Sequence, residues 1–369
     1  MPSQKALVLQ TRSGRLAVTT FPIPKPGPGE VLLKVHSASL NPVDVAIKKT
    51  GIFVNYYPAI LGSDLAGEVV ARGAGVTTVV PGDKIFLEGS FSNSYAGFQQ
   101  YALADINTLA KVRTTYVLVA HIIRPKSETV SPSQIPPTMT YDQAATMPLV
   151  CTTAFLALYN DVPHGLGLDS PLRSPGLYTG NAFLVVGGSS SVGQYAIQFA
   201  KASGFGPIIT TASPRHEQHL LSIGATHVLD RNQSLDSLKE RVQGILGTEK
   251  QLSYVIDAIS RTDTQHIAMT LVAPGGRLVT VREPVFKDGY KEKSISTVMA
   301  LKGLPQNVGL MRELWANMTK LLEDAIIQPL RYEVISGGLD GVPVGMKRME
   351  EQKVSGVKLV VHPQETAPS

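Results

Sequence analysis

The feature that most constrains this chain is a short apolar run that ends in glycines and leads into a helix-like pattern. Phe183 to Val186 is typical of a buried strand, and Val192 to Ser203 has the spacing of an amphipathic helix. In the loop between them, Gly188 is expected to form the tight turn, and Gly193 to let the helix pack closely on the strand. A helix N-terminus in this setting offers free N–H groups to a pyrophosphate. The pattern therefore predicts a dinucleotide-binding loop.

The middle position of this loop departs from the usual Gly-x-Gly-x-x-Gly pattern, because it is Ser190. Alone, the variant also fits an ordinary Gly/Ser turn in an α/β protein, and that alternative stays open. The strand before it and the helix after it favour a phosphate loop. The residues expected to contact the cofactor here are Gly188, Ser189, Ser190, Ser191, Val192 and Gly193.

The residues about twenty positions further on indicate which nicotinamide cofactor is used. NAD sites place an acidic residue there for the ribose hydroxyls, whereas a basic residue accommodates a 2′-phosphate. Here Ser213 and Arg215 come before any acid, and the first one is Glu217. We therefore expect NADPH, with Arg215 as the start of a solvated helix as the alternative. Asp257, at the end of a strand pattern, is a further expected cofactor contact.

The rest of the chain divides into two patterns. Up to about residue 110, short Val/Leu/Ile-rich runs alternate with Gly/Pro turns, which indicates a β-rich, barrel-like domain. After Met139, a helical pattern covers Tyr141 to Asn160, and strand and helix patterns then alternate. Such alternation predicts a parallel, doubly wound sheet, so the fold class is α/β. The strand-like runs are Lys5–Gln10, Glu30–Ser39, Gly67–Arg72, Asp83–Leu87, Phe183–Val186, Pro207–Ala212, His227–Leu229, Tyr254–Asp257, Arg277–Val281 and Val357–His362.

Composition excludes several classes of partner. The net charge of +5 is spread over 369 residues without a basic cluster, so no nucleic-acid partner is expected. The longest apolar run, Tyr116 to Ile123, is far shorter than the roughly 20 residues of a membrane helix. The single cysteine excludes internal disulfides. Without a secretory signal at the N-terminus, a cytoplasmic location is expected.

Residues 112–134 interrupt this organisation. Loops longer than about 15 residues without structure of their own are uncommon in compact domains, and removal of this one joins Lys111 to Ile135 in an ordinary connection. The codons for its first two residues, Val-Arg, can contain a splice-donor sequence. The codon for its last residue, Gln, can be a splice acceptor. The segment corresponds to about 69 nucleotides, so its removal would keep the reading frame. Our hypothesis is a translated intron, with a genuine insertion as the alternative.

Several motifs, in this order, resemble the medium-chain dehydrogenase/reductase superfamily, and within it the zinc-free branch of quinone oxidoreductases and fungal trans-acting enoyl reductases. The resemblance covers nearly the whole chain except residues 112–134. Its motifs are Asn41-Pro42-Val43-Asp44, Gly62-Ser63-Asp64-Leu65-Ala66-Gly67-Glu68-Val69, Pro81-Gly82-Asp83-Lys84, Gly97-Phe98-Gln99-Gln100-Tyr101, Ala144-Ala145-Thr146-Met147-Pro148, the glycine loop and Ala273-Pro274-Gly275-Gly276-Arg277.

The resemblance implies a GroES-like β-barrel catalytic domain plus a Rossmann-type doubly wound parallel sheet, with the active site between them. The expected boundaries are 1–152 for the catalytic domain, including the atypical insertion 112–134, then 153–305 for the Rossmann domain that binds NADPH. Residues 306–369 are expected to return to the catalytic domain. The oligomeric state is left as monomer or homodimer.

The resemblance also implies that no catalytic zinc is present. Zinc-dependent relatives place a Cys in the stretch where this chain has Asn41 to Asp44, and a His where it has Ser63. Only Cys151 matches a ligand position, and one soft ligand does not hold a catalytic zinc, which requires three protein ligands. Cys151 is expected to be a small buried hydrophobe.

Catalytic residues are expected from the same resemblance. Asn41 and Thr153 match residues that lie beside the nicotinamide, and Lys358 resembles a late lysine that contacts the cofactor, although Val357 is an extra residue in its motif. Asn41 as a turn residue and Thr153 as a helix-face residue are the alternatives. No proton donor is assigned. Some relatives carry a Tyr where this chain has Phe53, and Tyr56 and Tyr57 are close by.

The predicted function is a zinc-independent, NADPH-dependent oxidoreductase that transfers hydride to an activated C=C bond. Fungal relatives with this pattern act in secondary metabolism, so a trans-acting enoyl reductase that serves the carrier domain of a polyketide synthase is the preferred case. The expected substrate is a small enone, a quinone or an enoyl thioester. Alternatives are an NADPH quinone reductase and, in another class, a non-catalytic NADPH-binding protein.

Overall fold

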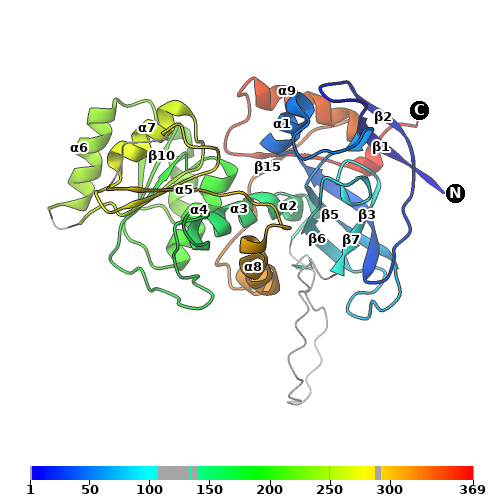
Figure 1. Cartoon of the computed structure of the whole chain (residues 1–369), viewed down its shortest axis with the longest axis horizontal. Coiled ribbons are helices and arrows are strands. Elements are labelled where there is room, and N and C mark those ends of the chain that lie inside the picture. The colour runs from blue at the N-terminus through cyan, green and yellow to red at the C-terminus, as the bar shows by residue number, and fades with distance from the viewer. Residues whose placement is uncertain (1, 107–132, 135–138, 249, 287–291, 369) are drawn as a thin grey trace, which may run out of the picture.

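The computed structural model describes residues 2–106, 133–134, 139–248, 250–286 and 292–368. Within these residues the chain forms two halves, which lie side by side in Figure 1. One half is built around a parallel sheet, and the other around antiparallel strands from both ends of the chain. The expected α/β fold, with a GroES-like part and a Rossmann-type part, is confirmed.

The parallel sheet has the order β11-β10-β9-β12-β13-β14. The strand order reverses between β9 and β12: β10 and β11 extend the sheet on one side of β9, and β12, β13 and β14 extend it on the other. Open α/β sheets bind ligands at such a switch point. The strands are β9 (Phe183–Val186), β10 (Ile208–Ala212), β11 (His227–Asp230), β12 (Tyr254–Asp257), β13 (Arg277–Thr280) and β14 (Ser294–Thr297). Its helices are α4 (Ser191–Ala202), α5 (Glu217–Ser222), α6 (Leu235–Leu246) and α7 (Thr262–Leu271).

The other half contains a sheet of order β15-β16-β3-β5-β6-β8, with β7 also paired to β3, and a smaller sheet of order β2-β1-β4. The C-terminal strand β16 pairs antiparallel with β3, so the red and blue ends of the chain lie together in Figure 1. The elements are β1 (Ser3–Leu9), β2 (Leu16–Pro22), β3 (Glu30–Ser39), α1 (Pro42–Thr50), β4 (Ala59–Ile60), β5 (Asp64–Arg72), β6 (Lys84–Glu88), β7 (Tyr101–Asp105), β8 (Ser133–Gln134), β15 (Tyr332–Val334), α9 (Gly341–Glu350) and β16 (Lys358–Val361).

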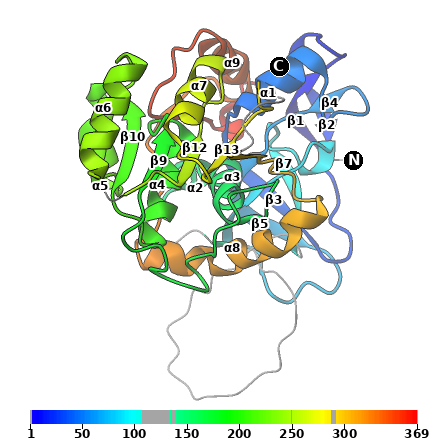
Figure 2. The same cartoon turned by 60° about the vertical axis from the view of Figure 1, so that its left-hand side comes forward.

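Three helices lie between the halves: α2 (Tyr141–Ala145), α3 (Pro148–Tyr159) and α8 (Pro305–Glu323). The sequence predicts one helix from Tyr141 to Asn160, and the structure divides it. Thr140 caps α2 by accepting from the Gln143 N–H, and Pro148, which has no N–H, begins α3. Buried side chains of α3 and α8 share one core with β9 and α4. Trp315 of α8 also lies against Phe86 of β6, with ring centroids 5.7 Å apart, so α8 packs against both halves (Figure 2).

Short 3₁₀ turns complete the described elements: η1 (Asn93–Tyr95), η3 (Pro214–His216), η4 (Gly338–Asp340) and η5 (Pro363–Glu365). Most of the segment 112–134 lies outside the described residues. Its last two residues form β8, which pairs with Ile85 and Phe86 of β6. Among the described residues, no helix is long and apolar enough to cross a membrane.

Candidate active site

The glycine loop joins β9 to α4 at the carboxyl edge of the parallel sheet. The left-handed turn falls on Gly187, with a φ of 81°, and not on Gly188, to which the sequence assigned it. At Gly188 the constraint is a close approach, because an added Cβ would lie 2.0 Å from the Thr210 Oγ1 atom. At Gly193, an added Cβ would lie 2.3 Å from the Gly187 carbonyl oxygen, so this glycine packs the helix on the strand as predicted.

The N-terminus of α4 is organised by the serine that replaces the usual middle glycine. Ser190 is the N-cap, and its hydroxyl oxygen accepts from the Gly193 N–H at 3.0 Å. Ser189, Ser191 and Val192 stay partly exposed around this end of the helix. The first N–H groups of a helix have no partner inside it, so this terminus can hold an anion.

A basic cluster follows β10, and it joins residues distant in sequence. The Arg215 Nε atom lies 3.3 Å from the His216 Nε2 atom, and an Arg331 nitrogen lies 3.5 Å from Nδ1 of the same ring. Ser355 completes the group, with its hydroxyl 2.9 Å from Nε2. Burial, together with the Arg215, Arg331 and Arg231 guanidinium groups, lowers the pKa of His216. The exposed Arg215 and the half-buried Ser213 therefore lie in a region of positive potential.

Arg331 and Ser355 were not found from the sequence, because neither lies near the glycine loop in the chain and neither belongs to a motif. The segment that carries Ser355 passes directly against His216. An added Cβ at Gly356 would lie 2.5 Å from the His216 ring.

Asp257 ends β12, on the other side of the switch point. It is fully buried, and its Oδ1 atom accepts the Ile259 N–H at 3.0 Å and the Ser260 N–H at 2.9 Å. Its Oδ2 atom has no hydrogen-bond partner among the described residues. Asp257 thus fixes the loop after β12, and burial raises its pKa.

Asn41 and Lys358 meet in a buried polar cluster with Asp64. Asn41 donates through Nδ2 to the Asp64 carboxylate at 2.7 Å, and Lys358 donates to the Asn41 Oδ1 atom. The Lys358 Nζ atom lies 3.1 Å from Asp64 Oδ2, and both side chains are almost fully buried. The structure therefore places the Lys358 side chain with Asn41 and Asp64, while its backbone N–H donates to the Arg331 carbonyl oxygen at 2.8 Å. Ser63 borders this cluster, 3.3 Å from Asn41 Nδ2.

A cavity of about 420 Å³ opens beside this cluster, between the two halves. Val281 and Val298, which follow β13 and β14, line one side, so the cavity lies at the carboxyl edge of the parallel sheet. Thr153 of α3 lines it as well, and its hydroxyl donates to the Leu149 carbonyl oxygen at 2.6 Å. The remaining lining residues are Val43, Phe53, Ser63, Glu88, Gly89, Ser90, Phe91, Leu149, Arg282, Glu283, Thr297, Met299, Ala300, Leu301, Lys302 and Gly303.

Phe53, which stands where some relatives carry a Tyr, and the nearby Tyr56 and Tyr57 lie in different places in the structure. Phe53 lines the cavity and stacks on Phe91, with ring centroids 5.4 Å apart. Neither Tyr56 nor Tyr57 is among the lining residues. Tyr56 instead donates to the Ser92 hydroxyl at 3.2 Å.

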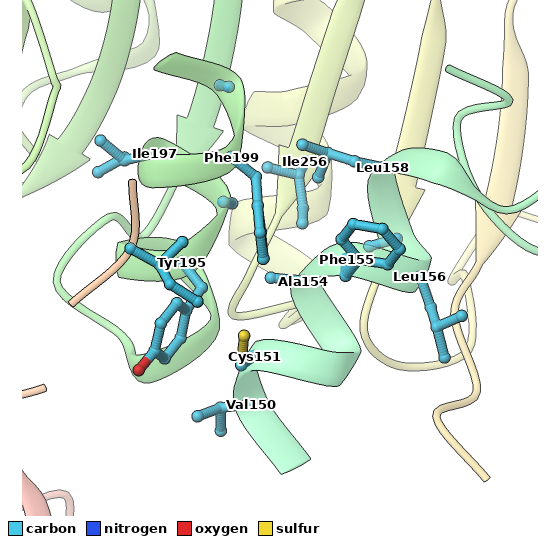
Figure 3. Packing of buried hydrophobic residues seen from close by; sticks show 14 of the residues in the cluster. Val150, Cys151, Ala154, Phe155, Leu156, Leu158, Tyr195, Ile197, Phe199 and Ile256 are labelled. Atoms are coloured by element: carbon cyan, nitrogen blue, oxygen red, sulfur yellow. The ribbon is translucent and has the colours of Figure 1, made fainter. Parts of the chain in front are cut away.

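Cys151 lies on α3 inside the apolar core, with Tyr195 and Phe199 of α4 beside it (Figure 3). Burial raises the pKa of its thiol well above the ordinary value. The prediction of a small buried hydrophobe is confirmed at this position. Within the described ranges, no group of three or more His, Cys, Asp or Glu side chains is arranged to hold a metal ion.

Comparison with known proteins identifies both halves. Residues 27–114 match the alcohol dehydrogenase GroES-like domain, and residues 191–305 match the zinc-binding dehydrogenase domain. The dehydrogenase azaJ of Aspergillus niger is 32% identical over 98% of this chain and 99% of its own length. The trans-enoyl reductase tndF of Aspergillus flavipes is 30% identical over 97% of this chain and 98% of its own.

Solved structures agree on the fold. An alcohol dehydrogenase superfamily protein from Novosphingobium aromaticivorans superposes with a TM-score of 0.76 at 21% identity, over 97% of this chain and 99% of its own. The CurK enoyl reductase superposes with a TM-score of 0.73 at 20% identity, again over 97% and 99%. At these identities the likeness concerns the fold.

Proposed function

The chain belongs to the medium-chain dehydrogenase/reductase superfamily and is an oxidoreductase of this superfamily with a nicotinamide cofactor; on that premise, we propose that it reduces an activated C=C bond with NADPH and without zinc. The observation that carries this proposal is the cavity of about 420 Å³ at the carboxyl edge of the parallel sheet. Its exposed surface is largely apolar, and its polar lining residues include Ser63, Glu88, Thr153 and Lys302. The bound cofactor supplies a hydride to the substrate.

The proposal of NADPH rests on the basic cluster beside the glycine loop. A 2′-phosphate requires positive charge and hydrogen-bond donors near the end of the second strand of the sheet. Arg215 and Arg331 supply charge there, and Ser213 and Ser355 supply hydroxyl groups. The nearest acid in the chain, Glu217, is exposed at the start of α5. The α4 N-terminus, capped by Ser190, is suited to the pyrophosphate.

The proposal of zinc independence rests on which atoms fill the polar cluster. Catalytic zinc takes three protein ligands from thiolate, imidazole or carboxylate groups. Here an amide, a hydroxyl and an ammonium group surround the Asp64 carboxylate, and the Lys358 ammonium pairs with it at 3.1 Å. A cation would have to displace this lysine. The neighbouring Asp44 carboxylate accepts the Asn41 and Gly62 N–H groups. Cys151 points into the core, so the residues present do not fit zinc.

The apolar lining favours an acyl chain over a small polar substrate. Phe53, Phe91 and Leu149 offer apolar surface along the cavity. The Ser63 hydroxyl, which accepts from the Asn41 amide, can donate to a substrate carbonyl oxygen. The relative from Aspergillus flavipes is named a trans-enoyl reductase. We therefore propose an enoyl thioester as substrate, delivered by the carrier domain of a polyketide synthase.

The test is a substrate panel with the full-length protein. Enones, quinones and N-acetylcysteamine enoyl thioesters are mixed with NADPH or NADH, and the loss of reduced-cofactor absorbance is followed. We expect turnover of enoyl thioesters with NADPH, and turnover that persists after dialysis against a zinc chelator. Turnover of quinones alone would favour the quinone reductase. Cofactor binding without any turnover would favour the non-catalytic class.

A further inference from the structure

One buried acid in the cavity has no role in the chemistry above. Glu88 is the last residue of β6 and lies directly opposite Asp64 of β5 in the antiparallel register. Residues opposite one another on neighbouring strands direct their side chains to the same face. The two carboxyl groups therefore lie on the same face of the sheet, and Glu88 lines the cavity.

The surroundings of the two carboxyl groups are very different. Asp64 accepts from the Asn41 amide, the Ser39 hydroxyl and the Leu149 N–H, and it also pairs with Lys358, which together fit an ionised carboxylate. Glu88 is only 9% exposed, and its Oε2 atom has no hydrogen-bond partner among the described residues. When two carboxyl groups lie close together, the one with fewer donors keeps the proton.

Lys302 also lies next to Glu88, but its ammonium group is directed at the backbone. Its Nζ atom donates to the Glu88 carbonyl oxygen at 3.2 Å. Burial and the nearby Asp64 charge raise the pKa of Glu88 to about 8, although Lys302 and Thr152 offset part of this rise. Glu88 is therefore largely protonated at neutral pH. Burial also lowers the pKa of Lys302, and Glu88 and Asp105 oppose this.

We propose that Glu88 is the proton donor of the reaction, delivering its carboxyl proton to the α-carbon of the substrate. The assignment rests on the proposed C=C reduction. When hydride reaches the β-carbon, a C–H bond forms there and the π electrons of the double bond pass to the α-carbon and carbonyl oxygen. The α-carbon then forms its own C–H bond with the Glu88 proton. The O–H bond of the carboxyl group breaks, and its electron pair stays on oxygen.

Lys302 has a positioning role in this step. Once the proton has left, the Glu88 carboxylate is a buried negative charge beside Asp64, which is costly unless a cation is near. The Lys302 ammonium group, which donates to the Glu88 carbonyl oxygen, is the nearby cation, and it can turn toward the new carboxylate. Solvent water that enters after product release returns a proton to Glu88, and the cycle is balanced.

The test uses Glu88→Gln in the full-length protein, with Glu240→Gln on the exposed face of α6 as the matched control. The substrate is an N-acetylcysteamine thioester of 2-methyl-2-butenoic acid, because protonation of its α-carbon creates a stereocentre. In D₂O the wild-type protein is expected to place deuterium on one face of the α-carbon. Glu88→Gln should be slower by about 10²-fold and give both configurations, whereas NADPH affinity is unchanged.

A second measurement needs neither cofactor nor substrate. The infrared difference spectrum between wild-type protein and Glu88→Gln at pH 7 should contain a protonated-carboxyl stretching band, and the band should decline as the pH rises past about 8. Glu88→Asp, which keeps an acid at a shorter reach, should recover part of the stereoselectivity.

The outcomes separate this assignment from the proposed function. A wild-type protein that reduces no unsaturated substrate overturns the function, and with it the assignment. A wild-type protein that works, together with a Glu88→Gln variant of equal rate and stereoselectivity, overturns the assignment alone. Absence of the infrared band at pH 7 also overturns it. If Glu88→Gln is too unstable to assay, Glu88→Asp is compared with wild type for rate and stereoselectivity. Complete loss of both the rate and the stereoselectivity in Glu88→Asp counts against the assignment.

Discussion

Lys358 and Asp64 form a buried ion pair, with Nζ and Oδ2 3.1 Å apart, that joins the last strand of the chain to β5. Asp64 also accepts the Leu149 N–H at the start of α3, at 2.7 Å. One carboxylate therefore connects the C-terminal strand, the antiparallel sheet and the helix that lies against the parallel-sheet half.

Removal of the ammonium group should be strongly destabilising. We expect Lys358→Met to lower the free energy of unfolding by about 3–5 kcal/mol, because it leaves Asp64 as an uncompensated buried charge. The measurement is denaturant unfolding. Lys347→Met, at an exposed pair on α9, is the control and should change stability by less than about 1 kcal/mol. Equal effects of the two substitutions would contradict this account of the cluster.

Arg215→Glu should change cofactor preference. The substitution places a carboxylate where we propose the 2′-phosphate, so NADPH affinity should fall by at least about tenfold, since a charged hydrogen bond contributes about 1.5–3 kcal/mol. NADH affinity should change little. Affinity is measured by fluorescence titration, with Arg241→Glu on α6 as the control. An equal loss for both cofactors would count against NADPH.

Gly193→Ala should abolish cofactor binding through packing. The added methyl group would meet the Gly187 carbonyl oxygen at 2.3 Å and the Gly188 Cα atom at 2.9 Å, so the helix has to move away from the loop. Gly244→Ala on α6 is a matched control, because its Cβ meets nothing within 4 Å. We expect the control to gain about 0.5–1 kcal/mol in stability. Retention of cofactor affinity in Gly193→Ala would show that the loop tolerates the shift.

The pH dependence of stability should carry the signature of Glu88. Its pKa is raised in the folded protein to about 8, from an ordinary value of 4.5, so between these values the folded state binds a proton that the unfolded state has lost. This contribution to the free energy of unfolding is fully present below about pH 4.5 and decreases as the pH rises to about 8. Glu88→Gln should therefore lose less stability than wild type between pH 5 and pH 9. Parallel curves for the two proteins would contradict the raised pKa.

The segment 112–134 can be tested on messenger RNA. If it is a translated intron, mature transcripts should join the codon of Lys111 directly to that of Ile135. Amplification and sequencing across this junction give the answer. Transcripts that all contain the segment would make it a genuine insertion.

The parallel-sheet half was largely predictable from local patterns. The short apolar runs, the glycine loop and the helix after it follow one another in sequence, and each boundary is set by neighbouring residues. Even here, the left-handed residue is Gly187 and not Gly188, since two adjacent glycines are equally free to adopt a positive φ and tertiary contacts decide between them.

The cavity was less predictable, because it depends on pairing between distant strands. Glu88 lies beside Asp64 only through the register of β5 and β6, and β3 adds bulges where it pairs with β5. A shift of one residue would turn Glu88 to the other face of the sheet. Lys302 and Arg331 belong to no motif, and their partners are far away in the chain.

The pairing of β16 with β3 has a consequence for synthesis on the ribosome. Strands β9 to β14 form a continuous stretch and can pair as soon as they have emerged, whereas the sheet that begins near the N-terminus waits for residues 358–361. Until residues 358–361 have been made, β3 lacks its last neighbour and Asp64 lacks its cation. A nascent chain that stalls before Lys358 therefore leaves the β3 edge open at Ala38 and Ser39, where β16 pairs.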